Sequence, residues 1–328
     1  MPHAYIQGTG AYVPRRVLTN ADLEKMVDTS DDWITQRTGI RERRIAADEE
    51  ATSDLALEAA RQALGRCGVH AEDLDAVIVS TLTPDTMTPA TAAYVQNGLG
   101  AVKACAFDLN AACTGFVYGV TVGSSLIASG VYGTVLIIGA ETLSRVIDFT
   151  DRNTCILFGD GAGAAVLARA PEGSPSRIID HYLRSDGGGG DLIVIPAGGS
   201  RSPARARTVE ERLHFLKMQG REVFKFATRS MIELLETALQ RNGLAVEDLD
   251  IVIPHQVNYR VIEAALRKVP VPEERIYLNL DRYGNTSAAS VPIALDEAVS
   301  AGRVKRGDLV LLVAFGAGLT WGYNLLRW

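Results

Sequence analysis

Cys113 is the first residue in the chain whose type and setting suggest chemistry. It lies among small residues, Asn110 to Gly115, between an apolar run and a helix-like run from Gly119 to Ile127. A sharp strand-to-helix turn needs such small neighbours, and it leaves the side chain at the N-terminus of the helix. The unpaired N–H groups and the dipole there favour thiolate over thiol. Cys113 is therefore a candidate nucleophile, although this segment alone is better explained by a buried core cysteine.

Two further residues could assist such a nucleophile. His255 directly follows the apolar run 251–254, where a side chain would stand at the open edge of a sheet. The other four histidines, His3, His70, His181 and His214, lie in polar or loop contexts without such a strand. Asn285 precedes an alanine-rich segment, where it could equally be a helix N-cap. Each residue has an ordinary structural explanation, and only their combination favours catalysis.

An internal repeat indicates how these residues could meet. The sequence Glu-Asp-Leu-Asp occurs at 72–75 and again at 247–250, 175 residues later, and each copy leads into a strand-like run. A second pair of apolar runs, 135–138 and 310–313, has the same offset. The preceding helices carry matching apolar stripes, formed by Ala56, Ala59, Ala60, Ala63 and Leu64 and by Met231, Leu234, Leu235, Ala238 and Leu239. Gly68 and Gly243 follow these stripes as helix-ending residues with positive φ.

The repeat predicts two fused α/β halves, residues 1–175 and 176–328, with a Gly- and Ser-rich connection at 185–210. Cys113 would end a strand of the first half, and His255 and Asn285 would end strands of the second. Duplicated sheets of this kind bring such strand ends to a shared junction. We therefore expect the three residues to form one site.

Composition narrows the class of protein. The chain has 328 residues, 47% of them hydrophobic and 22% charged, which is typical of a soluble globular protein. Its net charge of −6 argues against general binding to nucleic acid, and no apolar run is long enough to cross a membrane. No secretory signal is visible at the N-terminus, so we expect a cytoplasmic location. The four cysteines show no zinc spacing, and we expect no metal site.

Four segments carry a resemblance to a known family: Asn110 to Phe116, Pro254 to Asn258, Gly284 to Ser290, and Ala314 to Gly322. Together they resemble the β-ketoacyl-acyl-carrier-protein synthase III family of the thiolase superfamily, and the similarity runs nearly from end to end. The resemblance implies an α/β protein with the thiolase-like duplicated five-layer α-β-α-β-α fold, assembled as a homodimer. Thiolases proper differ, since they place a second cysteine where this chain has a glycine-rich turn.

The resemblance also implies a two-stage decarboxylative Claisen condensation that initiates type II fatty-acid synthesis. Cys113 would take an acyl group from a short acyl-CoA, and malonyl-acyl-carrier protein would then lose CO₂ and attack that thioester. His255 and Asn285 would donate hydrogen bonds to the malonyl thioester oxygen, and the backbone N–H groups of Cys113 and Ala317 would hold the other oxyanion. Acyl-CoA is a substrate here, and no cofactor is expected.

Residues outside the triad are assigned by the same resemblance. The CoA contacts would be Thr29, Trp33, Arg37, Arg152, Gly220 and Asn258, with Trp33 and Arg152 on either side of the adenine. The acyl pocket would be lined by Met87, Leu143, Phe158, Leu216 and Met218, with Met87 reaching in from the partner subunit. Carrier-protein docking would use Lys225, Arg260, Arg267 and Lys268. Taken alone, Trp33 could be surface packing and the basic residues a solvated helix face.

Three other functions remain open from the sequence. A related condensing enzyme could use the same triad to prime a secondary-metabolite pathway of the polyketide type. A Cys-His hydrolase would account for Cys113 and His255, but it would leave the repeat unexplained. A non-enzymatic module that binds an acyl carrier would have no use for an intact triad.

Overall fold

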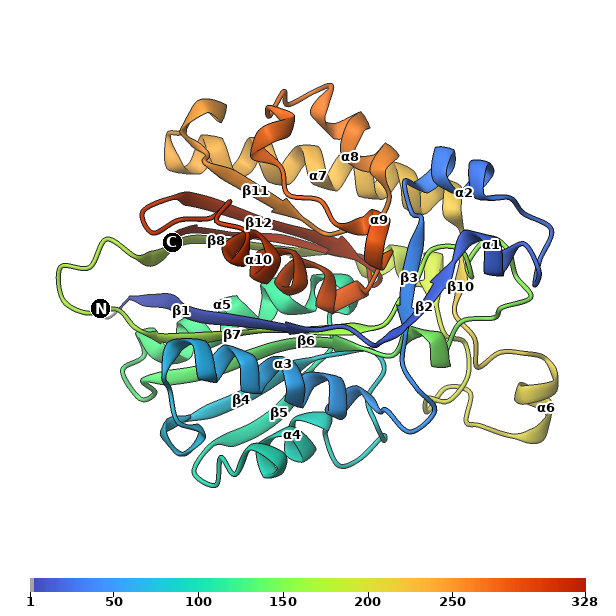
Figure 1. Ribbon diagram of the computed structural model, residues 1–328, viewed down its shortest axis with the longest axis horizontal. Coiled ribbons are helices and arrows are strands. Elements are labelled where there is room, and N and C mark those ends of the chain that lie inside the picture. Colours follow the sequence, from blue (N-terminus) through green and yellow to red (C-terminus); the bar gives the residue numbers. More distant parts are fainter. Residues whose placement is uncertain (1–2) are drawn as a thin grey trace.

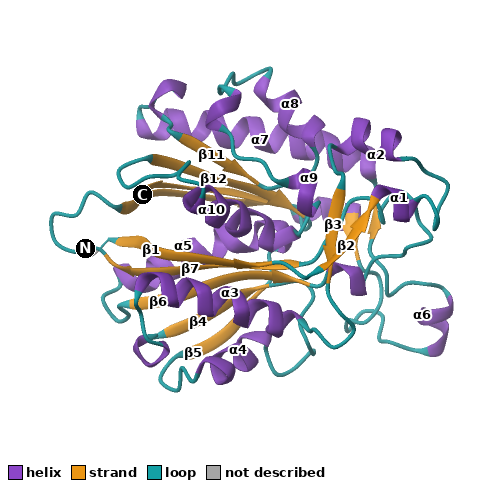
Figure 2. Ribbon diagram, viewed as in Figure 1, coloured by secondary structure: helices purple, strands orange, loops and turns teal. Residues whose placement is uncertain are grey.

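The computed structural model describes residues 3–328 as two large β-sheets, with helices between and outside them, and two small two-stranded sheets, β2-β3 and β9-β10 (Figure 1 and Figure 2). The first sheet has the strand order β1-β7-β6-β4-β5. Its strands are β1 (Ala4–Tyr12), β4 (Ala76–Ser80), β5 (Cys105–Leu109), β6 (Thr134–Glu141) and β7 (Gly161–Arg169). The second sheet has the order β11-β12-β13-β8. Its strands are β8 (Arg177–Ser185), β11 (Ile251–Pro254), β12 (Leu309–Gly316) and β13 (Thr320–Arg327).

Six helices complete five layers. Helices α3 (Thr52–Cys67) and α4 (Thr91–Leu99) cover the outer face of the first sheet. Helices α5 (Gly115–Ala128) and α10 (Ser290–Ser300) lie between the sheets, and α7 (Gly220–Asn242) and α8 (Tyr259–Leu266) cover the second (Figure 1). The central helices are mostly apolar around their circumference because they pack against both sheets. The predicted thiolase-like five-layer fold is confirmed.

The remaining elements gather at one end of the layers, at the right of Figure 1. They are β2 (Arg16–Thr19), α1 (Asn20–Leu23), α2 (Asp31–Thr38), β3 (Glu42–Ile45), β9 (Ile193–Val194), α6 (Ala206–Glu210), β10 (Lys217–Met218) and α9 (Leu280–Tyr283). Two polar stretches of the sequence, 20–45 and 185–210, thus lie on the same end of the molecule. The second of them, expected to be a plain loop, contains β9 and α6.

The internal repeat extends to the pairing of strands. Ala76 of β4 lies opposite Val135 of β6, and Ile251 of β11 lies opposite Val310 of β12, both in parallel pairs. The same 175-residue offset relates both partners, so the two halves share one register. The glycines after α3 and α7 have φ values of 69° and 61°, the left-handed conformation that ends a helix.

One expectation about histidines is wrong. His181 lies inside strand β8, opposite Asn324 of β13, rather than in a loop. Its ring Nδ1 is 3.1 Å from the Asn324 side-chain nitrogen and 3.3 Å from the Thr121 hydroxyl. His181 is therefore a partly buried structural residue. Within residues 3–328, no helix combines the length and the apolar character needed to cross a bilayer.

Candidate active site

Cys113 lies in a tight turn that links β5 to the central helix α5. Residues 112–114 form a single 3₁₀ turn, and Ala112 has a φ of 46°, which few residues other than glycine adopt. The end of β12 approaches this turn closely at Gly316. A Cβ atom at Gly316 would lie 2.8 Å from the Cβ of Cys113, so only glycine fits there. The last residues of β12 are thus held against the candidate nucleophile.

The protonation state of Cys113 differs from the expectation. Burial raises the pKa of its thiol to about 11, whereas the helix N-terminus was expected to favour the thiolate. The Ser287 hydroxyl and the backbone N–H groups of Cys113 and Ala317 lower that pKa, but they do not offset the loss of solvent. Cys113 is therefore a thiol at neutral pH, and a proton acceptor is needed before it can attack a thioester.

His255 follows β11 and is buried, with 1% of its surface exposed. Burial lowers the pKa of the imidazole to about 3, so the ring is neutral. Its Nδ1 lies 2.6 Å from the Ser290 hydroxyl oxygen, at the start of α10. The Nε2 atom is buried and has no hydrogen-bond partner among the described residues, so it is free to contact a substrate.

Asn285 does not end a strand, contrary to the expectation; it follows α9 and Gly284. Its Oδ1 accepts a hydrogen bond of 2.8 Å from the backbone N–H of Ser287, whose φ is 49°. Asn110 makes the same turn in the first half, where its Oδ1 accepts from Ala112 at 3.2 Å. Asn285 thus turns the chain into α10 as Asn110 turns it into α5. Extending the 175-residue repeat to these two asparagines would have revealed this relationship from the sequence.

The three candidate catalytic residues line one cavity between the halves. Cys113, His255 and Asn285 share it with Ala317, and its volume is about 50 Å³. The expected acyl-pocket residues Leu143, Phe158, Leu216 and Met218 also line it. Because one water-sized group requires at least about 10–15 Å³ by this measure, the cavity holds roughly four such groups. This is room for a short acyl chain.

A larger groove of about 840 Å³ shares part of its lining with this cavity. Four of the expected CoA contacts, Trp33, Arg37, Gly220 and Asn258, line it. Apolar residues border both spaces, namely Leu157, Met218, Val223, Ala227 and Val257. The groove therefore provides a path along which a long, narrow substrate could reach Cys113 from the surface.

Comparisons with known proteins agree with this geometry. Residues 107–187 match the family model for 3-oxoacyl-[acyl-carrier-protein] synthase III, and residues 239–328 match the model for its C-terminal part. A β-ketoacyl-[acyl-carrier-protein] synthase III of Caldanaerobacter subterraneus is 55% identical, covering 99% of this chain and 98% of the relative. A synthase III structure from Aquifex aeolicus is 47% identical with a TM-score of 0.91, covering 99% and 100%. The chain belongs to the β-ketoacyl-[acyl-carrier-protein] synthase III family.

This membership confirms the predicted acyltransferase class and the initiating condensation of fatty-acid synthesis. The polyketide alternative has weaker support. A priming β-ketosynthase from the R1128 polyketide pathway has a TM-score of 0.90 but is only 35% identical to this chain. Synthase III relatives at 50% identity or more cover nearly all of it. Among residues 3–328, no group of three or more His, Cys, Asp or Glu side chains is arranged to hold a metal ion.

The two residues expected to flank adenine in this synthase III lie against each other. The Arg152 guanidinium carbon is 4.9 Å from the centroid of the Trp33 ring, and that of Arg37 is 5.1 Å away. A purine stacked between Trp33 and Arg152 would contact both side chains, so the Trp33 ring and the Arg152 guanidinium would need to be about 7 Å apart. Arg152 also donates a 2.8 Å hydrogen bond to the backbone oxygen of Asp28. The side chains must therefore separate before an adenine can enter.

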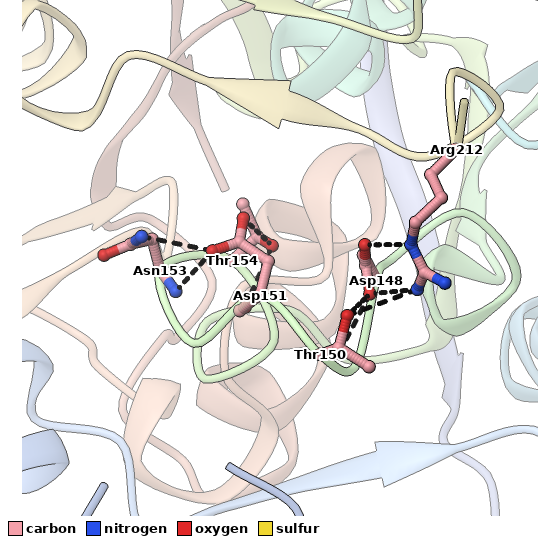
Figure 3. A network of polar contacts seen from close by, with 6 residues as sticks. All are labelled: Asp148, Thr150, Asp151, Asn153, Thr154 and Arg212. Carbon is pink, nitrogen blue, oxygen red and sulfur yellow. Dashed lines mark hydrogen bonds and ion pairs between the residues drawn. The ribbon is translucent and has the colours of Figure 1, made fainter. Parts of the chain in front are cut away.

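The loop that carries Arg152 is held by the polar contacts in Figure 3. The Asp148 carboxylate accepts two hydrogen bonds from Arg212, at 2.8 Å and 2.5 Å, and one from the Thr150 hydroxyl at 2.6 Å. The Arg212 guanidinium holds the pKa of the Asp148 carboxyl well below its usual range. Asp151 accepts hydrogen bonds from Asn153 and Thr154 in the same loop. Two segments far apart in sequence thus fix this side of the groove.

Only two of the four residues expected to dock the carrier protein line the groove. Lys225 and Arg260 line the groove, whereas Arg267 and Lys268 do not. Lys225 also pairs with Glu222 and Arg267 with Glu263, which reduces their free charge.

Thr29 does not line the groove, but its hydroxyl is buried without a partner among the described residues. Sequence reasoning missed Arg221, which lines the groove beside Lys225.

Met87 is 83% exposed and does not line the cavity of its own chain. Three polar residues around the candidate catalytic residues were not selected from the sequence: Glu141, Ser287 and Ser290. All three are buried, with at most 2% of their surface exposed. Ser287 and Ser290 stood within the Asn285 segment, and the residue types alone gave no reason to select them. Glu141 could not be selected from the sequence because its burial and its hydrogen bonds depend on contacts from other segments.

Proposed function

We propose that this chain condenses a short acyl-CoA with malonyl-acyl-carrier protein, with Cys113 as nucleophile and His255 and Asn285 as hydrogen-bond donors. The observation that carries the proposal is that all three line one small apolar cavity at the inner end of a surface groove. The groove, with a volume of about 840 Å³, has room for a long thioester substrate. The cavity beyond it has room for a short acyl group.

Acyl loading comes first. The Cys113 sulfur attacks the acyl-CoA carbonyl, and the oxyanion that forms would accept hydrogen bonds from the backbone N–H groups of Cys113 and Ala317. Both groups already approach the thiol sulfur. Backbone donors fixed in position stabilise such an oxyanion without reorganising during the reaction. In the net exchange the C–S bond to CoA breaks, the departing CoA thiolate takes up the proton that the Cys113 thiol lost, and CoA leaves through the groove.

Decarboxylation of malonyl-carrier protein follows in the same cavity. Negative charge develops on the malonyl thioester oxygen as CO₂ departs, and neutral donors stabilise it. Neutral His255 would supply Nε2–H in the tautomer whose Nδ1 accepts from the Ser290 hydroxyl. The Asn285 side chain would supply its Nδ2 group, since its Oδ1 is engaged by Ser287 N–H. The carbanion then attacks acyl-Cys113 and gives the β-ketoacyl product.

We also propose that the active form is a homodimer formed at strand β5. This strand is the edge of the first sheet, and Phe107 on it is exposed. Tyr94, Val102 and Met87 are exposed nearby in sequence. An open edge strand flanked by apolar side chains is prone to pair with another chain. Pairing of two copies there would give Met87 a partner whose acyl cavity it could limit.

The decisive experiment combines product analysis and acyl mapping. The chain is incubated with acetyl-CoA alone, and peptide mass mapping locates the acyl group. Malonyl-carrier protein is then added and the products are analysed. We expect acyl-Cys113 first and β-ketobutyryl-carrier protein second. An acyl group on Cys67, Cys105 or Cys155 with Cys113 free, or hydrolysis in place of condensation, would disprove the proposal.

A further inference from the structure

Arg43, on strand β3, is an arginine with 0% of its surface exposed. Its guanidinium donates hydrogen bonds to the backbone oxygen of Leu18 at 3.3 Å, the side-chain oxygen of Asn20 at 2.8 Å and the backbone oxygen of Ile156 at 2.6 Å. All three acceptors are uncharged, and the Nε atom has no partner among the described residues. An arginine stays charged in a protein, and burying it without a carboxylate costs free energy. Packing alone therefore does not account for this residue.

The guanidinium bond to Ile156 holds a segment that supports Asn285. The residues that follow run beside Asn285, with a parallel bridge between Phe158 and Asn285. The backbone N–H of Asn285 donates to the backbone oxygen of Leu157 at 2.8 Å, and its backbone oxygen accepts from Gly159 N–H at 3.0 Å. Both backbone hydrogen-bonding groups of Asn285 are thus paired with this segment, so the position of the segment sets the position of Asn285.

Two glycines allow Arg43 to lie against this pairing. A Cβ atom at Gly159 would lie 3.0 Å from the Cβ of Arg43 and 2.4 Å from the backbone oxygen of Tyr283. Gly284, just before Asn285, has a φ of 63°, and a Cβ atom there would lie 3.5 Å from the Cβ of Arg43. The backbone on both sides of Asn285 is therefore closely packed on Arg43, and such an interior transmits small displacements.

The outer end of the guanidinium is anchored through Asn20. The Asn20 oxygen accepts from Arg43, and its amide nitrogen donates to the Asp31 carboxylate at 2.7 Å and to the backbone oxygen of Ile40 at 2.8 Å. Because Asn20 is itself buried and fixed by these partners, the guanidinium has one position. Its inner end therefore holds Ile156 in one place.

The other two candidate catalytic residues are held by different elements. The backbone N–H of His255 donates to the backbone oxygen of Val313, on β12, at 2.7 Å. Cys113 is placed by the turn into α5 and by the close approach of Gly316. None of these contacts involves Arg43. A displaced guanidinium would therefore move Asn285 and leave the nucleophile where it is.

We infer that Arg43 is a positioning residue that sets the place of the Asn285 amide in the cavity, and that it thereby acts on decarboxylation of malonyl-carrier protein. Arg43 lines neither the cavity nor the groove. Its guanidinium holds Ile156, the bridge at Phe158 transmits that position, and Asn285 presents its Nδ2 group to the malonyl thioester oxygen. The inference rests on the proposed role of Asn285 as an oxyanion donor.

The test compares the two half-reactions in Arg43→Lys, which keeps the charge but not the planar fork that joins Asn20 to Ile156. Release of CO₂ from malonyl-carrier protein should fall at least about tenfold, since a misplacement of about 1 Å can cost roughly 100-fold. Single-turnover release of CoA at saturating acetyl-CoA should stay within about threefold, because the backbone donors around Cys113 are unchanged.

Two further single variants accompany it. Asn20→Ala removes one acceptor of the guanidinium and lines neither the cavity nor the groove. It should show a smaller loss of the same kind, and it carries the test if Arg43→Lys does not fold. Arg41→Lys, at an exposed position next to the same strand, is the matched control and should change neither rate.

Double variants separate positioning from a general loss of structure. If Arg43 acts through Asn285, Arg43→Lys should lower CO₂ release by less than about twofold in the Asn285→Ala background, and by its full factor in the His255→Ala background. Full losses in both backgrounds, equal loss of CoA release and CO₂ release, or an unchanged rate in Arg43→Lys would overturn the inference. If Asn285→Ala alone left CO₂ release unchanged, the proposed role of Asn285 would fail, and the inference with it.

Discussion

The Nδ1 atom of His255 lies 2.6 Å from the hydroxyl oxygen of Ser290, the first residue of α10. The backbone N–H of Gln256 points at the same oxygen, at 3.4 Å. In the tautomer whose Nδ1 accepts from the Ser290 hydroxyl, the imidazole carries its proton on Nε2, the buried atom without a partner among the described residues. We therefore expect Ser290 to favour the form of His255 that can donate to substrate.

Ser290→Ala should therefore slow decarboxylation of malonyl-carrier protein by about tenfold, equivalent to about 1.4 kcal/mol. The imidazole would lose the partner that selects its tautomer. Transfer of an acyl group from CoA to Cys113 should change little. Ser300→Ala, at the exposed end of the same helix, is the matched control. Equal rates of CO₂ release in both variants would show that Ser290 does not control the tautomer.

His255→Ala and Asn285→Ala should each reduce condensation roughly 100-fold or more, about 3 kcal/mol for one lost oxyanion donor. Acyl loading should fall much less, since the charge that they stabilise develops on malonyl. The two half-reactions are measured separately, by CO₂ release and by CoA release. A proportional loss of both would contradict this division of roles.

Arg212→Gln should weaken the binding of acyl-CoA without affecting the chemistry at Cys113. The paired hydrogen bonds between Arg212 and Asp148 hold the loop that carries Arg152, and Gln cannot replace them. We expect KM for acetyl-CoA to rise roughly threefold to tenfold, with kcat within about twofold. Arg207→Gln, which removes an exposed ion pair nearby in sequence, should leave KM unchanged. A fall in kcat alone would indicate a different role.

Reversing the charge of Lys225 and Arg260 should raise KM for malonyl-carrier protein and make the rate less sensitive to salt. Both residues line the groove, and an acidic partner would be attracted to them. Reversal at Arg61, on α3, is a control because Arg61 lies outside the groove. If the variants bind the carrier normally at low salt, the two residues are only solvated surface.

Met87→Phe and Met87→Trp should shift the preference toward acetyl-CoA over longer primers. Met is narrower and more deformable than these aromatic residues, and overpacking a filled pocket is unfavourable. We expect the unaltered chain to accept roughly four carbons, given the small cavity. Because Met87 is exposed on its own chain, the effect should require the dimer. Identical chain-length profiles in all three proteins would leave Leu216 or Met218 as the limit.

The duplicated framework and the candidate catalytic residues could both be predicted from the sequence. Local periodicity and backbone preference depend on the residues of one segment and can be recognised in the sequence. They account for the 175-residue repeat, the apolar stripes of α3 and α7, and the glycines that end these helices. Cys113, His255 and Asn285 could be chosen because residues at the turns beside the junction of two halves must converge. Asn285 was expected to follow a strand, whereas it follows α9. It nevertheless lies in the cavity where it was expected.

The protonation states of these residues could not be predicted from the sequence, because they depend on tertiary packing. The thiol pKa of about 11 and the imidazole pKa of about 3 both follow from burial, which depends on how the two sheets close over the central helices. Glu141 and Ser287 are 146 residues apart in the sequence, and both are buried near Cys113 only because the fold brings their segments together. Desolvation and convergent hydrogen bonds are properties of the packed interior, so no pattern along the chain reports them.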